Sequence, residues 1–211
     1  MPANWSTFRS NMKAKLGTPN QRTISEIADI HATEYVNAVK SAQLVITSSK
    51  VTIGVNKGVV KSAYEAAFNK LFKETTEMSP NYKGDNPNPN QEDSRNKIEA
   101  IFAPVATAIT VEWAKEIFTP VTVPVGYVLP TTGYQVLVPG DPNALKKDLA
   151  KAFFIAQSET NQETAFNVFI TALIAAYAEH LLKIAGVFNG LIPVPSAPPV
   201  PGPPFPWVGV V

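Results

Sequence analysis

The chain has 211 residues, which is enough to bury a hydrophobic core without help from metal ions or disulfide bonds. It contains no cysteine, which excludes thiol catalysis, zinc–thiolate sites and a disulfide framework. The 18 basic and 17 acidic residues give a net charge of +1, so no large basic field is present to bind phosphates, and we expect no nucleic acid partner.

The beginning of the chain is basic, because Arg9, Lys13, Lys15 and Arg22 all precede the first acidic residue, Glu26. Such a pattern is typical of the solvated face of a helix, and the alternative is a contact with an acidic neighbour. The same stretch lacks the apolar segment of a secretion signal, so we expect an intracellular protein.

Two helices are predicted in the first half of the chain. Apolar residues recur at the helical period from Thr23 to about Ile46, and Thr23 and Glu26 are spaced as a capping box. After a break at 47–58, the same period predicts a second helix over 59–78. The two helices are expected to form a helical hairpin.

A polar stretch rich in Asn and Pro separates this hairpin from the next helix. Residues 79–94 hold almost nothing that can be buried, so they are predicted to be a surface loop. Residues 95–118 have apolar positions in helical register, but Pro104 removes one backbone donor and should kink or split the helix.

The second half of the chain mixes extended and helical signals. Residues 119–140 are rich in β-branched and aromatic residues, which predicts a β-hairpin or two extended strands, and the prolines confine them to a sheet edge. Asp141 and Pro142 then look like the cap and first residue of a helix that continues to about Phe154. A last helix is predicted from about residue 159 to 188, ended by Asn189-Gly190.

This last helix contains the longest apolar run without charge, from Thr164 to Ala178. The run has about fifteen residues, whereas roughly twenty are needed to cross a bilayer. Extending it would place Glu179, His180 and Lys183 in the membrane. We therefore expect a helix that is a central core element or lies between subunits, and keep a membrane-active helical protein as an alternative.

No set of residues predicts catalysis or metal binding. His31 and His180 do not form the paired face that a helix-borne zinc site requires, and each is interpreted as an ordinary helical histidine. The glycines of 54–62 have the wrong spacing for a phosphate loop, and prolines occupy ligand places among the acidic and amide residues of 85–93. We expect no catalytic residue, no cofactor and no metal site, and hence no enzyme.

The C-terminal segment 193–211 is rich in proline and carries no charged side chain. Its prolines predict a stiff polyproline-II arm that reaches about 60 Å. Because a free apolar tip is an aggregation hazard, we expect the tip to dock on a neighbouring chain. The predicted partner-binding residues are Pro204, Phe205, Pro206, Trp207, Val208, Val210 and Val211.

The predicted architecture is mainly α: a multi-helix bundle with a β-hairpin-like insertion at about 119–140 and an extended proline-rich C-terminal arm. Residues 1–192 would form the helical domain and 193–211 the arm. With "APPVPGPPFPWVGVV" at the end of a cysteine-free chain rich in Ala, Val, Thr, Asn and Pro, the sequence resembles a virion structural protein of a tailed bacteriophage.

That resemblance implies a subunit of a shell, neck, tail or baseplate, assembled in the host cytoplasm. Its partners would be further copies of itself, other structural proteins of the same assembly, or both, with no membrane and no small-molecule substrate. The alternative is a cytosolic adaptor that presents "PSAPPVPGPPFP" to an aromatic-lined domain.

Overall fold

The computed structural model describes residues 3–17, 21–47, 50–51, 54–77, 90–119, 123–128, 133–156 and 159–211. The chain is mainly α, as predicted, with a small antiparallel sheet. The helices of the described part are α1 (Trp5–Leu16), α2 (Ile24–Val39), α3 (Lys57–Glu77), α4 (Asn90–Trp113), α5 (Pro142–Ala156) and α6 (Gln162–Leu182). The strands are β1 (Lys50–Val51), β2 (Ile117–Thr119), β3 (Tyr134–Pro139), β4 (Ile184–Phe188), β5 (Leu191–Val194), β6 (Ala197–Pro201) and β7 (Phe205–Val208).

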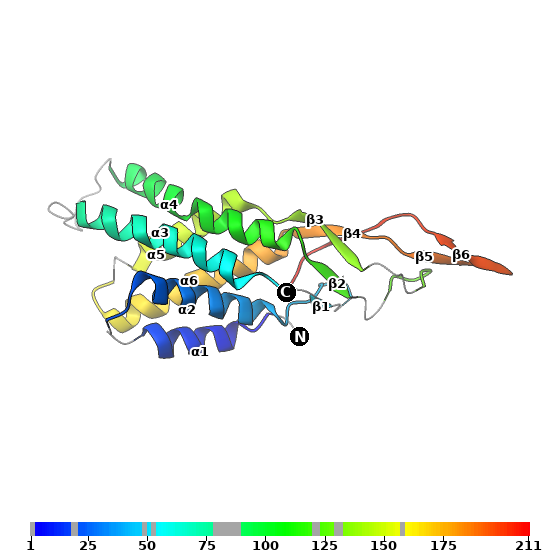
Figure 1. The fold of residues 1–211 in the computed structure, drawn as a ribbon, viewed down its shortest axis with the longest axis horizontal. Coiled ribbons are helices and arrows are strands. Elements are labelled where there is room, and N and C mark those ends of the chain that lie inside the picture. The colour runs from blue at the N-terminus through cyan, green and yellow to red at the C-terminus, as the bar shows by residue number, and fades with distance from the viewer. Residues whose placement is uncertain are drawn as a thin grey trace.

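The helices lie side by side in an elongated bundle, and the strands gather at one end of it (Figure 1). From α2 to α6 each helix packs on the next one along the chain, and α1 packs on both α2 and α6. The two ends of the described chain also lie at the sheet end of the bundle (Figure 1). The bundle therefore holds the first and last segments close to the same small sheet.

Two predicted helix starts are confirmed by their caps. The Thr23 hydroxyl accepts a hydrogen bond from the Glu26 backbone N–H (3.2 Å), and the Glu26 carboxylate accepts one from the Thr23 N–H (2.7 Å). The Asp141 carboxylate accepts bonds from the N–H groups of Asn143 (2.9 Å) and Ala144 (3.1 Å). These short-range hydrogen bonds satisfy backbone donors that have no partner within the helix.

The end predicted for α2 is wrong, because the helix stops at Val39 and not near Ile46. The residues beyond it pair with the end of the chain instead. The Gln43 N–H donates to the Val211 carbonyl (2.9 Å), and the Val211 N–H donates to the Gln43 carbonyl (3.0 Å). A pairing between distant parts of the chain thus replaces the last predicted helical turn.

The loop predicted for 79–94 is only partly within the described residues, since 78–89 lie outside them. α4 begins at Asn90, so the last residues assigned to the loop are helical. α4 then continues through Pro104 as one helix, so of the two predicted outcomes, a kink or a split, the split does not occur.

The long last helix of the prediction is wrong beyond Leu182. α6 ends there, and residues 184–188 form strand β4, whose alternating burial places Ile184, Gly186 and Phe188 in the interior. The apolar residues after Leu182 fit the period of the preceding helix, and for that reason the sequence predicts a helix there. In the structure they pair with β3 on one side and β7 on the other. Asn189-Gly190 therefore follows a strand and does not end a helix.

The main sheet has the strand order β1-β2-β3-β4-β7, with every neighbouring pair antiparallel. β2 and β3 pair antiparallel, with Phe118 opposite Tyr134. β3 lies within the extended region predicted for 119–140, whereas β2 begins at Ile117, inside the stretch predicted as helix, because α4 ends at Trp113. The prediction that they form a sheet edge is wrong, because β1 covers β2 and β4 covers β3. Pro139 ends β3, so no proline interrupts the interior of either strand.

Four aromatic side chains connect the helices at the centre of the core. The indole N–H of Trp113 donates to the hydroxyl of Tyr35 (2.8 Å), and the hydroxyls of Tyr64 and Tyr177 hydrogen-bond to each other. Burial raises the pKa of all three tyrosines above its usual range, so the hydroxyls stay neutral. Their polar atoms are satisfied within the bundle, which indicates a structural role.

Candidate interaction surface

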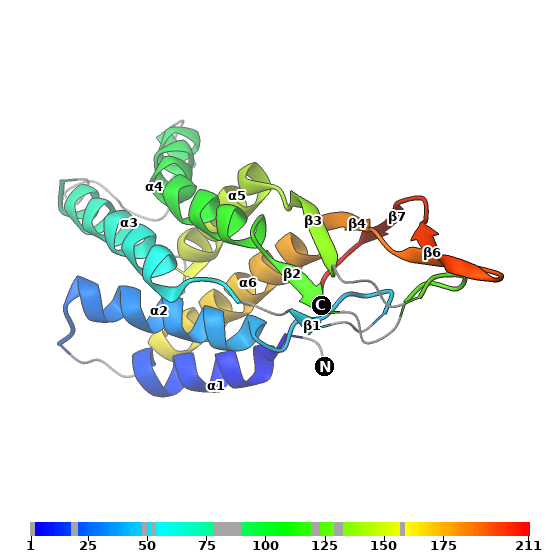
Figure 2. The ribbon, with the colours of Figure 1, turned by 45° about the vertical axis from the view of Figure 1, so that its right-hand side comes forward.

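The C-terminal segment differs from the expected single arm. After β4 the chain runs outward through β5, turns, returns through β6, and rejoins the main sheet as β7 (Figure 2). Ser196, between β5 and β6, has a φ of 61°, a left-handed conformation typical of a tight turn. The base of this hairpin is closed by a hydrogen bond from the Gly202 N–H to the Gly190 carbonyl (2.9 Å).

The hairpin β5–β6 projects from the end of the molecule (Figure 1). All five residues of β6 are exposed, including Val200 at 42%, and β5 is at most half-buried. No charged side chain occurs after Lys183. We call the exposed part of residues 191–204 the hairpin surface; it is uncharged, rich in proline and accessible.

Its attachment to the body is narrow. The Val128 N–H donates to the Leu191 carbonyl (2.8 Å), and the Tyr127 hydroxyl donates to the Pro203 carbonyl (2.6 Å). Sequence reasoning missed this hairpin, although Pro195-Ser196 between two short apolar runs is a turn signal. The dense prolines favoured a single polyproline-II arm instead.

The structure separates the predicted partner-binding residues into two groups. Pro204, Pro206 and Val208 are exposed and Phe205 and Val211 are half-buried, whereas Trp207 (2% exposed) and Val210 (0%) lie in this chain's own core. The expected free apolar tip is therefore not present. The Trp207 and Val210 side chains are buried within this chain because β7 pairs with the edge of β4.

The two histidines are buried in helices, as interpreted from the sequence. Burial lowers the pKa of His31 to about 3 and that of His180 to about 4. His31 lies among aromatic rings, and the His180 ring packs against Gly140. Among the described residues, no three side chains of the types that ligate metals come together.

In the glycine-containing loop that begins at Gly54, carboxylates of α4 and of the segment after it accept hydrogen bonds from the backbone. The Gly54 N–H donates to Glu116 (3.0 Å) and the Asn56 N–H donates to Glu112 (3.0 Å). The Asn56 side chain caps the start of α3 by accepting from the Gly58 N–H (2.8 Å). The N–H groups of Gly54 and Asn56 therefore already have anionic partners. The acidic and amide residues of 85–93 lie mostly outside the described residues.

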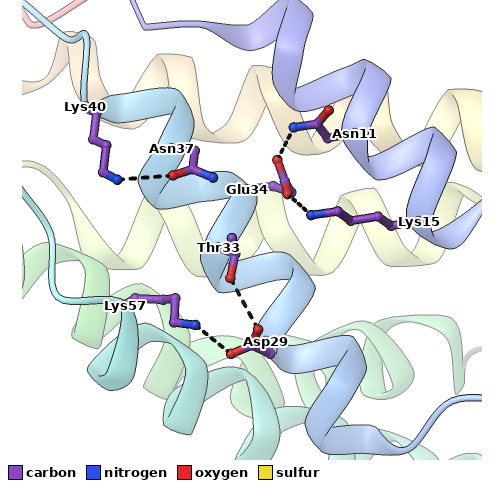
Figure 3. Close-up of polar contacts among 8 residues, drawn as sticks. All are labelled: Asn11, Lys15, Asp29, Thr33, Glu34, Asn37, Lys40 and Lys57. Atoms are coloured by element: carbon purple, nitrogen blue, oxygen red, sulfur yellow. Dashed lines mark hydrogen bonds and ion pairs between the residues drawn. The ribbon is translucent and has the colours of Figure 1, made fainter.

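Two basic residues of α1, Lys13 and Lys15, contact acidic residues of the same chain. Lys15 pairs with the buried carboxylate of Glu34 on α2 (2.5 Å), which also accepts from the Asn11 side chain (2.7 Å), as Figure 3 shows. Lys13 pairs with Glu163 at the start of α6 (2.9 Å), where both side chains are exposed. The charges of α1 thus help attach it to its neighbouring helices.

α6 is long and apolar enough to cross a membrane by length and composition. Its buried side chains nevertheless pack in the core of the bundle, against α5 and α1 among others. They are Phe169, Ile170, Leu173, Ala176, Tyr177, His180 and Leu181. This burial fits the expected core helix.

Comparison with known proteins gives no relative: no protein-family model, no curated protein and no solved structure matches the chain.

Proposed function

We propose that this protein is a non-enzymatic assembly subunit of a large protein complex, of the kind found in virions of tailed bacteriophages. Its partners are copies of itself or other structural proteins of the same assembly, put together in the host cytoplasm. In this proposal the C-terminal region docks on a neighbouring subunit, with the hairpin surface as the contact.

The observation that carries the proposal is the projecting hairpin β5–β6. A two-stranded hairpin of this kind adds little to the stability of its own domain, because β6 is exposed along its whole length and no residue of β5 is fully buried. Its proline content stiffens it, which lowers the entropy lost when it is fixed against a partner. A stiff, exposed and apolar projection is well suited to docking.

The absence of charged side chains on the hairpin surface favours a partner whose contact surface is also apolar and uncharged. Because the hairpin surface has no charged side chain, its docking would depend on apolar burial and backbone hydrogen bonds and would change little with salt. A nucleic acid partner would instead require a cluster of basic side chains. A protein surface with an apolar groove is the partner that fits.

The test is the mass of the protein in solution with and without a charge on the hairpin surface. Val200→Asp adds a carboxylate to an exposed residue of β6, which would have to be desolvated on docking. Val59→Asp is the matched control, since Val59 has a similar exposure (39%) in the first turn of α3, where an acidic residue is favoured. We expect the natural protein and Val59→Asp to form oligomers and Val200→Asp to be monomeric. An oligomer that survives Val200→Asp would remove the hairpin surface from the proposal.

The adaptor with a proline-rich ligand remains a second candidate because β6 is exposed along its whole length. An adaptor would bind an isolated aromatic-lined domain of the proline-recognising type while remaining monomeric itself. The same mass measurement, repeated with such a domain added, distinguishes the two functions.

A further inference from the structure

The last strand of the chain occupies a slot that is shaped for it. β7 pairs with β4 along its whole length, from Ala185 opposite Val208 to Phe188 opposite Phe205. Between them the Trp207 ring is buried edge-to-face against Phe118, with 5.5 Å between centroids. The slot therefore recognises a strand with a large aromatic residue at one position.

The residues after β7 fix the segment further. The Gly209 N–H donates to the Ile184 carbonyl (2.8 Å) and the Val210 N–H donates to the Leu181 carbonyl (3.0 Å). Val211 forms its double hydrogen bond with Gln43, and Val210 is fully buried. Residues 205–211 thus form one docking element, which we call the C-terminal latch, and its register is strictly specified.

The connection between β4 and the latch is weak by comparison. The prolines at 198, 199 and 201 have no N–H, so Ala197 and Val200 are the only backbone donors that β6 contributes to the β5–β6 ladder, and β5 lacks one donor at Pro193. A two-stranded hairpin is at best marginally stable in water even with a full ladder. Outside its own pairing, this hairpin is held to the body by the narrow attachment at Tyr127 and Val128. Opening it would lose few interactions.

We infer that the latch is exchanged between subunits: residues 205–211 of one copy occupy the slot beside β4 of a second copy. The inference rests on the proposed function, because it states how the subunits would be joined. An exchanged latch makes the same contacts in the second copy as it makes in its own chain, so the exchange sacrifices only the hairpin pairing and its attachment at Tyr127 and Val128. The prolines favour the extended connection that replaces them.

The reach of the connection permits the exchange. Residues 189–204 number sixteen, and when extended at roughly 3.1 Å per residue they span about 50 Å. A slot on an adjoining copy lies well within that distance when the two bodies touch at their sheet ends. The hairpin surface and the latch then act together, the first as the opened connection and the second as the anchor.

Cysteine substitution tests the exchange directly, because the natural chain has no cysteine. Gly209 hydrogen-bonds to Ile184, so the next pair, Ala185 and Val208, is a non-hydrogen-bonded pair with side chains close enough for a disulfide. A chain with Ala185→Cys and a differently tagged chain with Val208→Cys are unfolded together, refolded and oxidised. We expect a disulfide dimer that contains one of each chain. Ala185→Cys mixed with Val200→Cys is the control, and it should give no such dimer.

The double variant Ala185→Cys/Val208→Cys completes the test, since a disulfide forms in either arrangement of the latch. Exchange predicts covalent multimers after oxidation of the assembled protein. A single chain with an internal disulfide, found in a sample that is oligomeric before oxidation, would overturn the exchange and leave docking by the hairpin surface intact. A protein that is monomeric at every concentration overturns both this inference and self-assembly.

Discussion

The indole of Trp207 lies against Gly186, so closely that a Cβ atom on this glycine would be 2.6 Å from Cζ2 of the ring. The same atom would overlap the carbonyl oxygen of Gln135 on β3. Gly186 is thus enclosed between two neighbouring strands, and the absence of a side chain there permits the sheet to accept the latch.

Gly186→Ala is expected to destabilise the protein by about 1–3 kcal/mol, as overpacking of a filled site does. Either β4 must shift away from β3 or the Trp207 ring must leave its place. Urea unfolding followed by circular dichroism measures the change. Gly58→Ala is the control, because its nearest neighbour is an Asn56 side-chain atom at 3.3 Å and alanine favours the helix that begins there. An equal loss in both variants would contradict the close packing at Gly186.

Trp207→Ala is expected to release the latch. The lost burial and the cavity should reduce the free energy of unfolding by about 3–5 kcal/mol. Hydrogen exchange should show faster exchange at the amide of Val210, whose bond to Leu181 depends on the latch being seated. Val208→Ala serves as the comparison, since that side chain is 61% exposed and its loss should have little effect. If both variants protect Val210 equally, Trp207 is not the anchor of the latch.

The parts of the fold that were predictable depend on local signals. The capping box at Thr23 and Glu26, and the cap at Asp141 followed by Pro142, act over three or four residues, and a sequence shows such spacings directly. The apolar period then identifies most of each helix. These signals suffice for a mainly α bundle.

The predictions that were wrong concern segments that pair with distant parts of the chain. Gln43 pairs with Val211, and Ile184–Phe188 lies between β3 and β7, although each stretch continues the apolar pattern of a preceding helix. Local propensity favoured helix in both places, and hydrogen bonding to remote strands overrode it. The prediction of a single extended arm for the proline-rich segment was wrong for the same reason, since nothing nearby in the sequence indicates that the end of this segment pairs with β4.

Two lysines of α1 provide a matched comparison of ion pairs. Lys15→Ala leaves the carboxylate of Glu34, which is 1% exposed, with Asn11 as its remaining side-chain partner, so we expect a loss of about 1–2 kcal/mol. Lys13→Ala breaks an exposed pair with Glu163 and should change stability by less than about 1 kcal/mol. Thermal unfolding of both variants measures the difference. A larger loss for Lys13→Ala than for Lys15→Ala would refute the importance of burial at Glu34.

Acid should destabilise the protein through His31, which is surrounded by the rings of Tyr64, Phe68, Phe153 and Phe169. Burial lowers the pKa of His31 from 6.5 to about 3 in the folded state, so below pH 6.5 the unfolded chain binds a proton that the folded chain does not. Stability is therefore lost as the pH falls from 6.5 toward 3, by about 2 kcal/mol between pH 7.5 and 5.

His31→Phe removes this titrating group and keeps an aromatic ring in the site. Urea unfolding at pH 7.5 and at pH 5 gives the free energy for each protein, and the difference between the two pH values is the quantity to compare. We expect that difference to be smaller in His31→Phe than in the natural protein by about 2 kcal/mol, whatever the variant does to stability at pH 7.5. His180, whose pKa is lowered to about 4 by burial, remains in both proteins and contributes equally to each. An unchanged pH dependence in His31→Phe would mean that His31 is protonated in the folded protein as readily as in the unfolded chain.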